Sequence, residues 1–468
     1  MAVLDEDRLF PVDPKVRALA RDLYDGVKGL PLISPHGHTD PRWFAENENF
    51  PNPTDLFVTP DHYVFRMLHS QGIPLEALGV PRIDGGDTEQ DKRKIWRLFA
   101  RNFHLFRGTP SRLWITHAFQ EVFGITRRLS EETADDIYDQ IAECLAQDAY
   151  RPRDLFDRFN IEVISTTESP LDDLRWHQMI DSSGWQGRVV TAYRPDAVVD
   201  PDFEGFARNI ARFGDLTGED ATTWGGYLAA HRKRRADFKT YGATSSDHGH
   251  PTARTEDLPQ SEAAALFDKA LNGQCSAEEA DRFRGHMLTE MARMSLDDGL
   301  VLQIHPGALR NHSNDIFARF GRDKGYDIPM RTDYVSNLRP LLNAVGAAPG
   351  LSVIVFTLDE SSYARELAPL AGVYPALKLG PAWWFHDSYE GMTRFREMTT
   401  ETAGFYNTVG FNDDTRAFCS IPARHDVARR VDCSFIAKLV ETGRLDRDEA
   451  NEVAHDLAYR LAKQAYRL

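Results

Sequence analysis

Two histidines separated by one glycine stand at the end of an apolar run near the N-terminus. In LISPHGHTDP, residues 32–41, His36 and His38 flank Gly37. If the run is a β-strand, residues i and i+2 point to the same side, so both imidazoles face together. Neutral imidazoles are good zinc ligands, but two of them do not complete a zinc site. On this stretch alone, a pair of structural histidines in a turn is an equal alternative.

A carboxylate near the C-terminus could complete such a site. In FNDDTR, residues 411–416, an extended backbone puts Asn412, Asp414 and Arg416 on one face and Asp413 on the other. Two histidines, one carboxylate and an open coordination position form a catalytic zinc arrangement. The alternative is a structural ion pair between Asp414 and Arg416.

Other polar residues follow further apolar runs. His305 in QIHPGALR could be another metal ligand, a donor to a substrate, or a buried core histidine. Arg194 in YRPD and Arg310 in ALRNH offer planar guanidinium groups, which bind carboxylates in a bidentate manner. Surface ion pairs are the competing interpretation of both arginines. Asp247 and His248 in TSSDHGH are weaker candidates for substrate binding.

Eight short apolar runs must position these side chains. They are rich in β-branched residues and nearly continuous in hydrophobicity, as in parallel strands covered on both faces. Helical patterns lie between them; in one, Ser276 and Glu279 predict a capping box and Gly299 follows the expected end. The runs are residues 30–38, 161–170, 188–196, 242–250, 300–308, 351–360, 376–387 and 407–416.

The alternation of strands and helices predicts an α/β fold, a (β/α)8 TIM-type barrel. Active sites of this barrel are built at the C-terminal ends of the strands, where the polar residues stand here. A doubly wound sheet would also bind ligands at its strand ends. However, the chain has no G-x-G-x-x-G after the first run and no P-loop. The barrel is therefore favoured, and no nucleotide cofactor is expected.

The long segment between the first two runs predicts a large helical insertion between strands 1 and 2. We expect residues 1–44 to hold an N-terminal segment and strand 1, and residues 45–155 to form the insertion at the barrel mouth. Residues 156–468 are expected to form the remainder of the barrel. Within the insertion, Thr59 is predicted to cap a helix whose first residue is Pro60.

Charge and composition exclude several classes of partner. A net charge of -16 over 468 residues disfavours nucleic acid and anionic membrane surfaces. Four scattered cysteines without a C-x-x-C argue against a structural zinc module and a disulfide framework. No apolar run approaches the roughly 18–20 residues that span a bilayer. The N-terminus does not resemble a signal peptide, so we expect a cytoplasmic protein, with homo-oligomerisation left open.

Several blocks together resemble the uronate isomerase (glucuronate isomerase) family of the amidohydrolase superfamily. The superfamily carries H-x-H on its first strand and an aspartate on its last. The resemblance extends from about residue 10 to near the C-terminus. SPHGHTD replaces the family's C-H-C-H-L, DDTR replaces T-D-S-R, and HPGA replaces H-I-G-A, which leaves substrate preference open. The matching blocks are DHYVFRML…GI, ISTTESPLDDLRWH, YRPD, SDHG, QIHPGALRNH, GPAWWFHD and NDDTRAF.

The resemblance implies a reaction and a set of roles. It implies interconversion of D-glucuronate with D-fructuronate and of D-galacturonate with D-tagaturonate, by metal-assisted proton transfer between C2 and C1. One divalent metal, with zinc favoured, is implied at His36, His38 and Asp414. Tyr63, Asp414 and Arg416 are the implied catalytic residues. Tyr63 would shuttle a proton, and Arg416 would stabilise an enediolate or lower the pKa of Tyr63, which is ordinarily near 10.

Other interpretations remain at this point. Trp383 and Trp384 are expected to wall a hexuronate substrate, although paired aromatic residues are more often core. A metal-dependent hydrolase is the next enzyme class; the fourth run has no lysine, which disfavours a binuclear site and leaves mononuclear hydrolysis open. A non-catalytic sugar-binding protein would have lost the acid–base residues, all of which are present here.

Overall fold

The computed structural model describes residues 3–468, in which seven parallel strands form one sheet. The order β1-β2-β3-β4-β5-β8-β9 follows the chain, and every neighbouring pair is parallel. A short antiparallel pair, β6 with β7, stands apart from it. The strands are β1 (Leu32–Ser34), β2 (Ile161–Glu168), β3 (Arg188–Tyr193), β4 (Ser245–His248), β5 (Val301–Ile304), β6 (Ala308–Leu309), β7 (Ile328–Pro329), β8 (Val353–Val355) and β9 (Leu377–Leu379).

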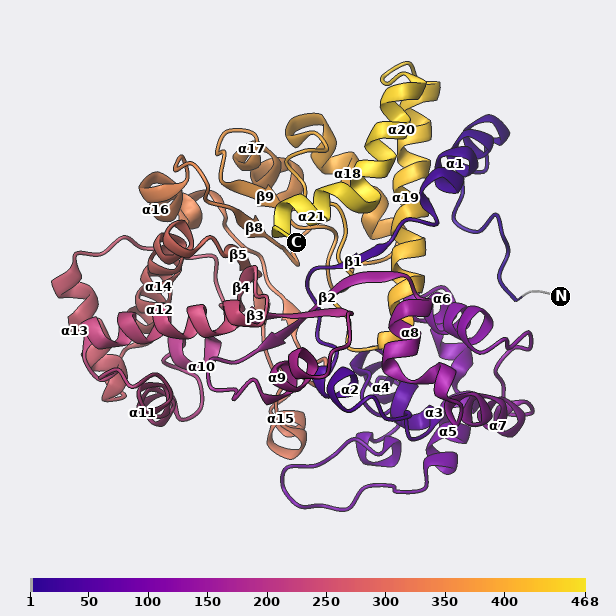
Figure 1. The fold of residues 1–468 in the computed structure, drawn as a ribbon, viewed down its shortest axis with the longest axis horizontal. Coiled ribbons are helices and arrows are strands. Elements are labelled where there is room, and N and C mark those ends of the chain that lie inside the picture. Colours follow the sequence, from indigo (N-terminus) through magenta and orange to yellow (C-terminus); the bar gives the residue numbers. More distant parts are fainter. Residues whose placement is uncertain (1–2) are drawn as a thin grey trace.

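A long helical segment joins β1 to β2 and gathers on one side of the sheet (Figure 1). Its buried residues form one cluster with Leu32 of β1 and Ile164 of β2, so these helices pack directly on the first two strands. Its helices are α2 (Pro41–Glu46), α3 (Pro53–Phe57), α4 (His62–His69), α5 (Lys92–Arg101), α6 (Pro110–His117), α7 (Ala134–Leu145) and α8 (Pro152–Arg158).

Helices also follow the later strands, and a second large core cluster joins most of them to β3, β5, β8 and β9. These helices are α9 (Arg175–Ser182), α10 (Asp196–Val199), α11 (Phe206–Thr217), α12 (Trp224–Thr240), α13 (Gln260–Leu271), α14 (Ala277–Asp298), α15 (Asn314–Phe320), α16 (Val335–Val345), α17 (Ala368–Ala371) and α18 (Tyr389–Ala403). Short 3-10 turns span Leu75–Leu78, Phe103–Phe106, Asp148–Tyr150 and Phe418–Ser420, and π-helical turns span Ala118–Val122, Tyr363–Leu367 and Asp456–Arg460.

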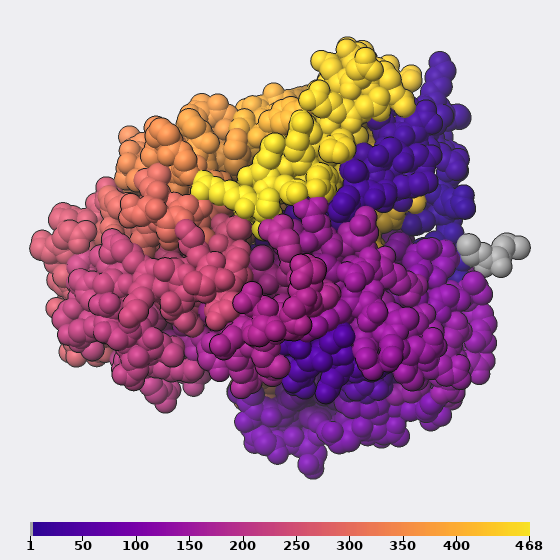
Figure 2. Space-filling view, viewed as in Figure 1, coloured from indigo at the N-terminus to yellow at the C-terminus, as the bar shows by residue number. Residues whose placement is uncertain are grey.

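The two ends of the chain pack together. Helix α1 (Pro14–Val27) contacts α19 (Ile421–Glu441) and α20 (Arg447–His455), and α21 (Leu461–Tyr466) follows. The indigo and yellow segments therefore lie side by side in Figures 1 and 2. No helix within residues 3–468 combines the length and apolar character that crossing a membrane requires.

The first seven predicted strands are confirmed, but the eighth is not a regular strand. Residues 407–416 join the sheet only through a parallel bridge between Thr408 and Leu379. Gly410 and Asp414 both have positive φ values, +73° and +37°, which interrupt an extended backbone. The prediction that Asn412, Asp414 and Arg416 alternate on one strand is therefore wrong; Asn412 donates instead to the hydroxyl of Tyr466.

Of the two predicted helix starts, one is confirmed and the other is wrong. The capping box of Ser276 and Glu279 is confirmed at α14, and Gly299 adopts the left-handed conformation at its end. The predicted cap at Thr59 is wrong, because α4 begins at His62 and Asp61 accepts from the backbone N–H of Tyr63. The Thr59 hydroxyl donates to the carbonyl of Leu78.

A buried polar network joins the C-terminal halves of β2 and β3. Both Thr166, at 2.9 Å, and Thr191 donate hydroxyl hydrogens to Glu168 Oε2. His177 of α9 lies with Nε2 2.9 Å from the Thr166 hydroxyl. Burial raises the pKa of Glu168 to about 8 although both threonines oppose this, and burial lowers the pKa of His177 to about 4. Both groups are therefore neutral near pH 7.

We predict that Glu168→Gln becomes increasingly stable, relative to wild type, as pH rises from about 4.5 to about 8. In this range the unfolded glutamate ionises while the folded one keeps its proton, so wild-type stability falls with pH. The slope is up to about 1.4 kcal/mol per pH unit, and glutamine removes it. Denaturant unfolding at several pH values measures the difference.

Glu162→Gln on the same strand is the matched control. Lys463 and Tyr459 lower the pKa of Glu162 despite its partial burial, so its effect should not grow over this pH range. A Glu168→Gln difference that stays constant with pH would contradict a protonated Glu168.

Candidate active site

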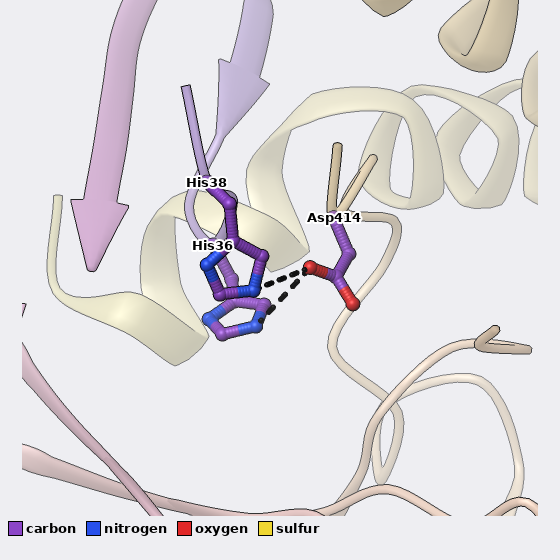
Figure 3. Close-up of side chains that lie close together, drawn as sticks. All are labelled: His36, His38 and Asp414. Carbon is purple, nitrogen blue, oxygen red and sulfur yellow. Dashed lines mark ion pairs between the residues drawn. The ribbon is translucent and has the colours of Figure 1, made fainter. Parts of the chain in front are cut away.

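The structure brings His36, His38 and Asp414 together. Asp414 Oδ1 lies 3.5 Å from His36 Nε2 and 3.2 Å from His38 Nε2, and both imidazoles face this oxygen (Figure 3). The three potential ligand atoms all lie within 4.8 Å of one another. This is the expected set of two histidines and one carboxylate, and it could hold one metal ion.

Backbone contacts from two other segments fix the two histidines. Strand β1 ends at Ser34, so both histidines lie just beyond it. The backbone N–H of His38 donates to the carbonyl of Thr415 at 3.0 Å. The hydroxyl of Thr167, on β2, donates to the carbonyl of Gly37 at 2.9 Å. The H-x-H segment is thus held from both sides, by β2 and by the segment that carries Asp414.

The environment favours a charged Asp414 and a neutral His38. Burial acts to raise the pKa of Asp414, but His36, His38 and the indole N–H of Trp383 together hold it well below its usual range. Burial lowers the pKa of His38 even though Asp414 opposes this. Anionic carboxylate and neutral imidazole are the forms that bind metals.

A cavity of about 410 Å³ opens beside these three side chains. This volume lies within the range of small-molecule sites. Predicted site residues from five further segments reach its wall; these are Tyr63, Arg194, His305, Arg310, Trp383, Trp384 and Arg416.

Four arginines, Arg194, Arg310, Arg322 and Arg416, line the cavity together with six aspartates. Arg194 pairs with Asp196 at 2.9 Å and lies 3.5 Å from Asp247, and Arg310 pairs with Asp327 at 3.1 Å. Within residues 3–468, Arg416 forms no ion pair. Its guanidinium group is therefore available to an anionic ligand.

His305 belongs to the wall of the cavity but not to the group of three possible ligands. Its Nε2 lies 2.9 Å from Asp247 Oδ1, and its ring centroid is 6.3 Å from that of His36. Asp247 thus contacts both His305 and Arg194 from behind the cavity, whose lining it does not join. The neighbouring His248 faces the other side of β4, as alternation along a strand requires, and its Nε2 lies 3.2 Å from Ser246 Oγ.

Tyr63 differs from the expectation of a lowered pKa. Burial raises the pKa of Tyr63 well above its usual range, and Asp387, which accepts its hydroxyl hydrogen at 3.1 Å, raises it further. The arginine that most opposes this shift is Arg424, not the predicted Arg416. Tyr63 is therefore a protonated phenol in this structure.

The sequence profile of the glucuronate isomerase family (UxaC) matches residues 12–466. The chain belongs to this family. A uronate isomerase of Rhizobium meliloti (strain 1021) is 68% identical over 466 residues, which cover 100% of this chain and 99% of that protein.

Solved structures of two family members are similar throughout. The glucuronate isomerase of Caulobacter crescentus has a TM-score of 0.98 and 60% identity, covering 99% of this chain and 97% of its own. The uronate isomerase of Thermotoga maritima has a TM-score of 0.92 and 27% identity, with both chains covered completely.

Several residues that line the cavity were not predicted from the sequence. His62 stacks on Tyr63 with ring centroids 4.9 Å apart, and its place beside Tyr63 in the DHY block was a usable signal. Thr167 also had a signal, because it lies near the end of a predicted strand. Asp323 lines the cavity from the loop after α15, and Arg416, Arg194 and Arg310 lower its pKa although burial acts to raise it. No motif marks this position.

We predict that Trp383→Phe weakens metal binding by roughly 10–100-fold, the usual effect of losing a hydrogen bond to a metal ligand. Phenylalanine keeps the aromatic contacts with His305 and Phe356 but loses the N–H that donates to Asp414. Competition with a zinc chelator measures the affinity.

Trp384→Phe is the matched control, because the buried indole N–H of Trp384 has no hydrogen-bond partner within residues 3–468. Equal affinities for the Trp383→Phe variant and wild type would contradict a role for this hydrogen bond.

Proposed function

We propose that the cavity beside His36, His38 and Asp414 is where this chain interconverts hexuronates with their keto forms. Family membership over residues 12–466 and 68% identity to a uronate isomerase show that the chain is an isomerase of uronates. The residue roles, the metal and the proton path are our proposal. The convergence of two imidazoles and one carboxylate beside the four arginines of the cavity wall is the observation that carries it.

One divalent metal, preferably zinc, fits the residues present. Asp414 Oδ1 is buried and accepts no hydrogen bond from residues 3–468, although two imidazole nitrogens face it. Such an oxygen is costly to bury unless another group, such as a cation, completes its surroundings. When bound, the metal would polarise the substrate oxygens. His36, His38 and Asp414 would hold it, and His305 would remain a substrate contact rather than a ligand.

The arginines are proposed to bind the substrate and its developing charge. Arg194 and Arg310 would receive the hexuronate carboxylate, since planar guanidinium groups match a carboxylate. Arg416, which has no ion-pair partner within residues 3–468, would stabilise the negative charge of an enediolate. Trp383 and Trp384 would wall the sugar. Asp247 and His248 are proposed to act indirectly, because neither lines the cavity.

Tyr63 and Asp414 are the proposed acid–base residues. Isomerisation breaks the C2–H bond and forms a C1–H bond, while the C2 hydroxyl becomes a carbonyl and the C1 carbonyl becomes a hydroxyl. Tyr63 would transfer the proton between the two carbons, and Asp414 would assist ring opening. The substrate would be a small hexuronate, and every proposed residue is in one chain.

The finer architecture belongs to the same proposal. We propose that residues 407–411 close the sheet into a (β/α)8 barrel as an irregular eighth strand. Residues 45–155 would be the insertion at its mouth, with residues 1–44 and 156–468 forming the barrel. The bridge between Leu379 and Thr408 and the bond from His38 to Thr415 support this closure.

The direct test is incubation of the metal-loaded protein with D-glucuronate and D-galacturonate in deuterated water. Ketose products with deuterium at C1 are expected, because a proton that passes through an enzyme residue can exchange with solvent. Hydrolysis of amide or ester substrates without any ketose product would contradict the isomerase proposal. Ketose that never carries deuterium would contradict proton exchange through Tyr63.

We predict that Asp414→Asn lowers turnover by at least about 10²-fold while leaving the fold intact, since a charged ligand and acid–base group is lost. Circular dichroism and thermal unfolding check the fold. Turnover within a few-fold of wild type would remove Asp414 from the mechanism.

A further inference from the structure

A second layer of charged residues lies directly behind Tyr63. The Tyr63 hydroxyl donates to Asp387 Oδ2 at 3.1 Å, and Arg424 Nη1 donates to the same oxygen at 2.9 Å. The three residues come from α4, from the loop after β9 and from α19. They form a tyrosine–carboxylate–arginine arrangement in which both donors share one carboxylate oxygen, here called the Tyr63 triad.

Only the tyrosine of this triad reaches the cavity. Tyr63 lines the cavity wall, whereas Asp387 and Arg424 are absent from the lining. The Arg424 side chain is only 3% exposed. Its guanidinium carbon lies 3.6 Å from the ring centroid of Trp114 and 5.3 Å from that of Tyr63. Asp387 therefore reaches the cavity through Tyr63, whereas Arg424 also donates to the carbonyl of Asp413, next to Asp414.

We infer that Asp387 and Arg424 are positioning residues that orient the Tyr63 hydroxyl and give its proton an acceptor. This inference rests on the proposed role of Tyr63 in uronate isomerisation. Because the hydroxyl hydrogen is directed at Asp387, the oxygen lone pairs of Tyr63 are left free for the substrate. Arg424 holds Asp387 in place through their hydrogen bond. Arg424 is in turn held by its contact with Trp114 and by its hydrogen bond to the carbonyl of Asp413.

The proton path balances without an added reagent. As the Tyr63 oxygen receives the proton from substrate C2, the C–H electron pair stays on the substrate as an enediolate. The original phenolic proton passes to Asp387 Oδ2. Transfer of the C2 hydroxyl proton to the C1 oxygen then moves the enediolate charge onto the C2 oxygen. Delivery of a proton from Tyr63 to C1, with return of the Asp387 proton to Tyr63, forms the C2 carbonyl and restores both side chains.

The charges of the triad act on Tyr63 in opposite directions. Apart from burial, Asp387 and, less strongly, Asp414 raise the pKa of Tyr63, while Arg424 and, less strongly, Arg66 lower it. Removing the charge of Asp387 should therefore lower the pKa of Tyr63. A residue that merely supported packing would not shift the pH dependence of turnover in this direction.

The same helix offers a matched control. Asp426 of α19 accepts from the hydroxyl of Tyr24, and Arg430 Nε lies 3.0 Å from each of its carboxylate oxygens. This second arrangement has the same three residue types, and none of its members lines the cavity. Asp426→Asn therefore removes an equivalent buried charge away from the substrate.

The experiment compares Asp387→Asn, Asp426→Asn and Tyr63→Phe in the metal-loaded protein with D-glucuronate. We expect Asp387→Asn to lower kcat by about 10²-fold with KM within a few-fold, since general acid–base groups contribute at least this much. Its alkaline loss of kcat should move to lower pH. Asp426→Asn should keep kcat within about threefold of wild type, even if both asparagine variants lose similar thermal stability.

A double-mutant cycle separates positioning from packing. In the Tyr63→Phe background, Asp387→Asn should change kcat less than twofold, because no hydroxyl remains to orient. Loss of kcat by the same factor in both backgrounds, or an unchanged kcat and pH profile in Asp387→Asn alone, would overturn the inference.

The outcomes distinguish this inference from the proposed function. An impaired Tyr63→Phe beside a fully active Asp387→Asn would overturn the triad alone. A fully active Tyr63→Phe would overturn both the proposed role of Tyr63 and the triad. Absence of ketose from the wild-type protein would overturn the proposed function itself.

Discussion

The site depends on the hydrogen bond that joins two segments far apart in the chain, from the His38 backbone N–H to the Thr415 carbonyl. This bond lies between the segment after β1 and the segment that carries Asp414. Together with the bonds from Thr167 to the Gly37 carbonyl and from the Trp383 indole to Asp414, it fixes the separation of the two imidazoles and the carboxylate. The packing of α1 against α19 and α20 brings the same two ends of the chain together at a larger scale. The group of His36, His38 and Asp414 therefore lies between the segment that follows β1 and the segment that follows β9.

Burial and nearby charges shift the pKa values of Asp414 and His38 in opposite directions. Burial alone would neutralise Asp414, yet two imidazoles and an indole N–H keep it charged, while burial keeps His38 neutral. The protein carries a net charge of -16, and its cavity is lined by four arginines and six aspartates. Of these arginines, Arg194 and Arg310 are each paired with an aspartate, whereas Arg416 forms no ion pair within residues 3–468. At Tyr63, likewise, the charge of Asp387 raises the pKa while the charge of Arg424 lowers it.

Local patterns in the sequence predicted the parts of the structure that local forces determine. Seven apolar runs became parallel strands, and H-x-H fell at the end of the first. The eighth run did not become a regular strand, because Gly410 and Asp414 have positive φ values. The hydrophobicity of the sequence does not reveal these φ values. His248 was grouped with Asp247, although adjacent residues of a strand face opposite sides. Asp387 could not be linked to Tyr63, because 324 positions separate them and only the folded chain brings them together.

Anomalous scattering from crystals of the catalytically active, metal-loaded protein would locate the metal directly. Data collected on both sides of the zinc absorption edge should give one strong peak per chain, bounded by His36 Nε2, His38 Nε2 and Asp414 Oδ1. The peak should be lost in the Asp414→Asn and His38→Asn variants. A peak elsewhere in the chain, or no peak in crystals whose protein still isomerises glucuronate, would contradict a metal site formed by these three residues.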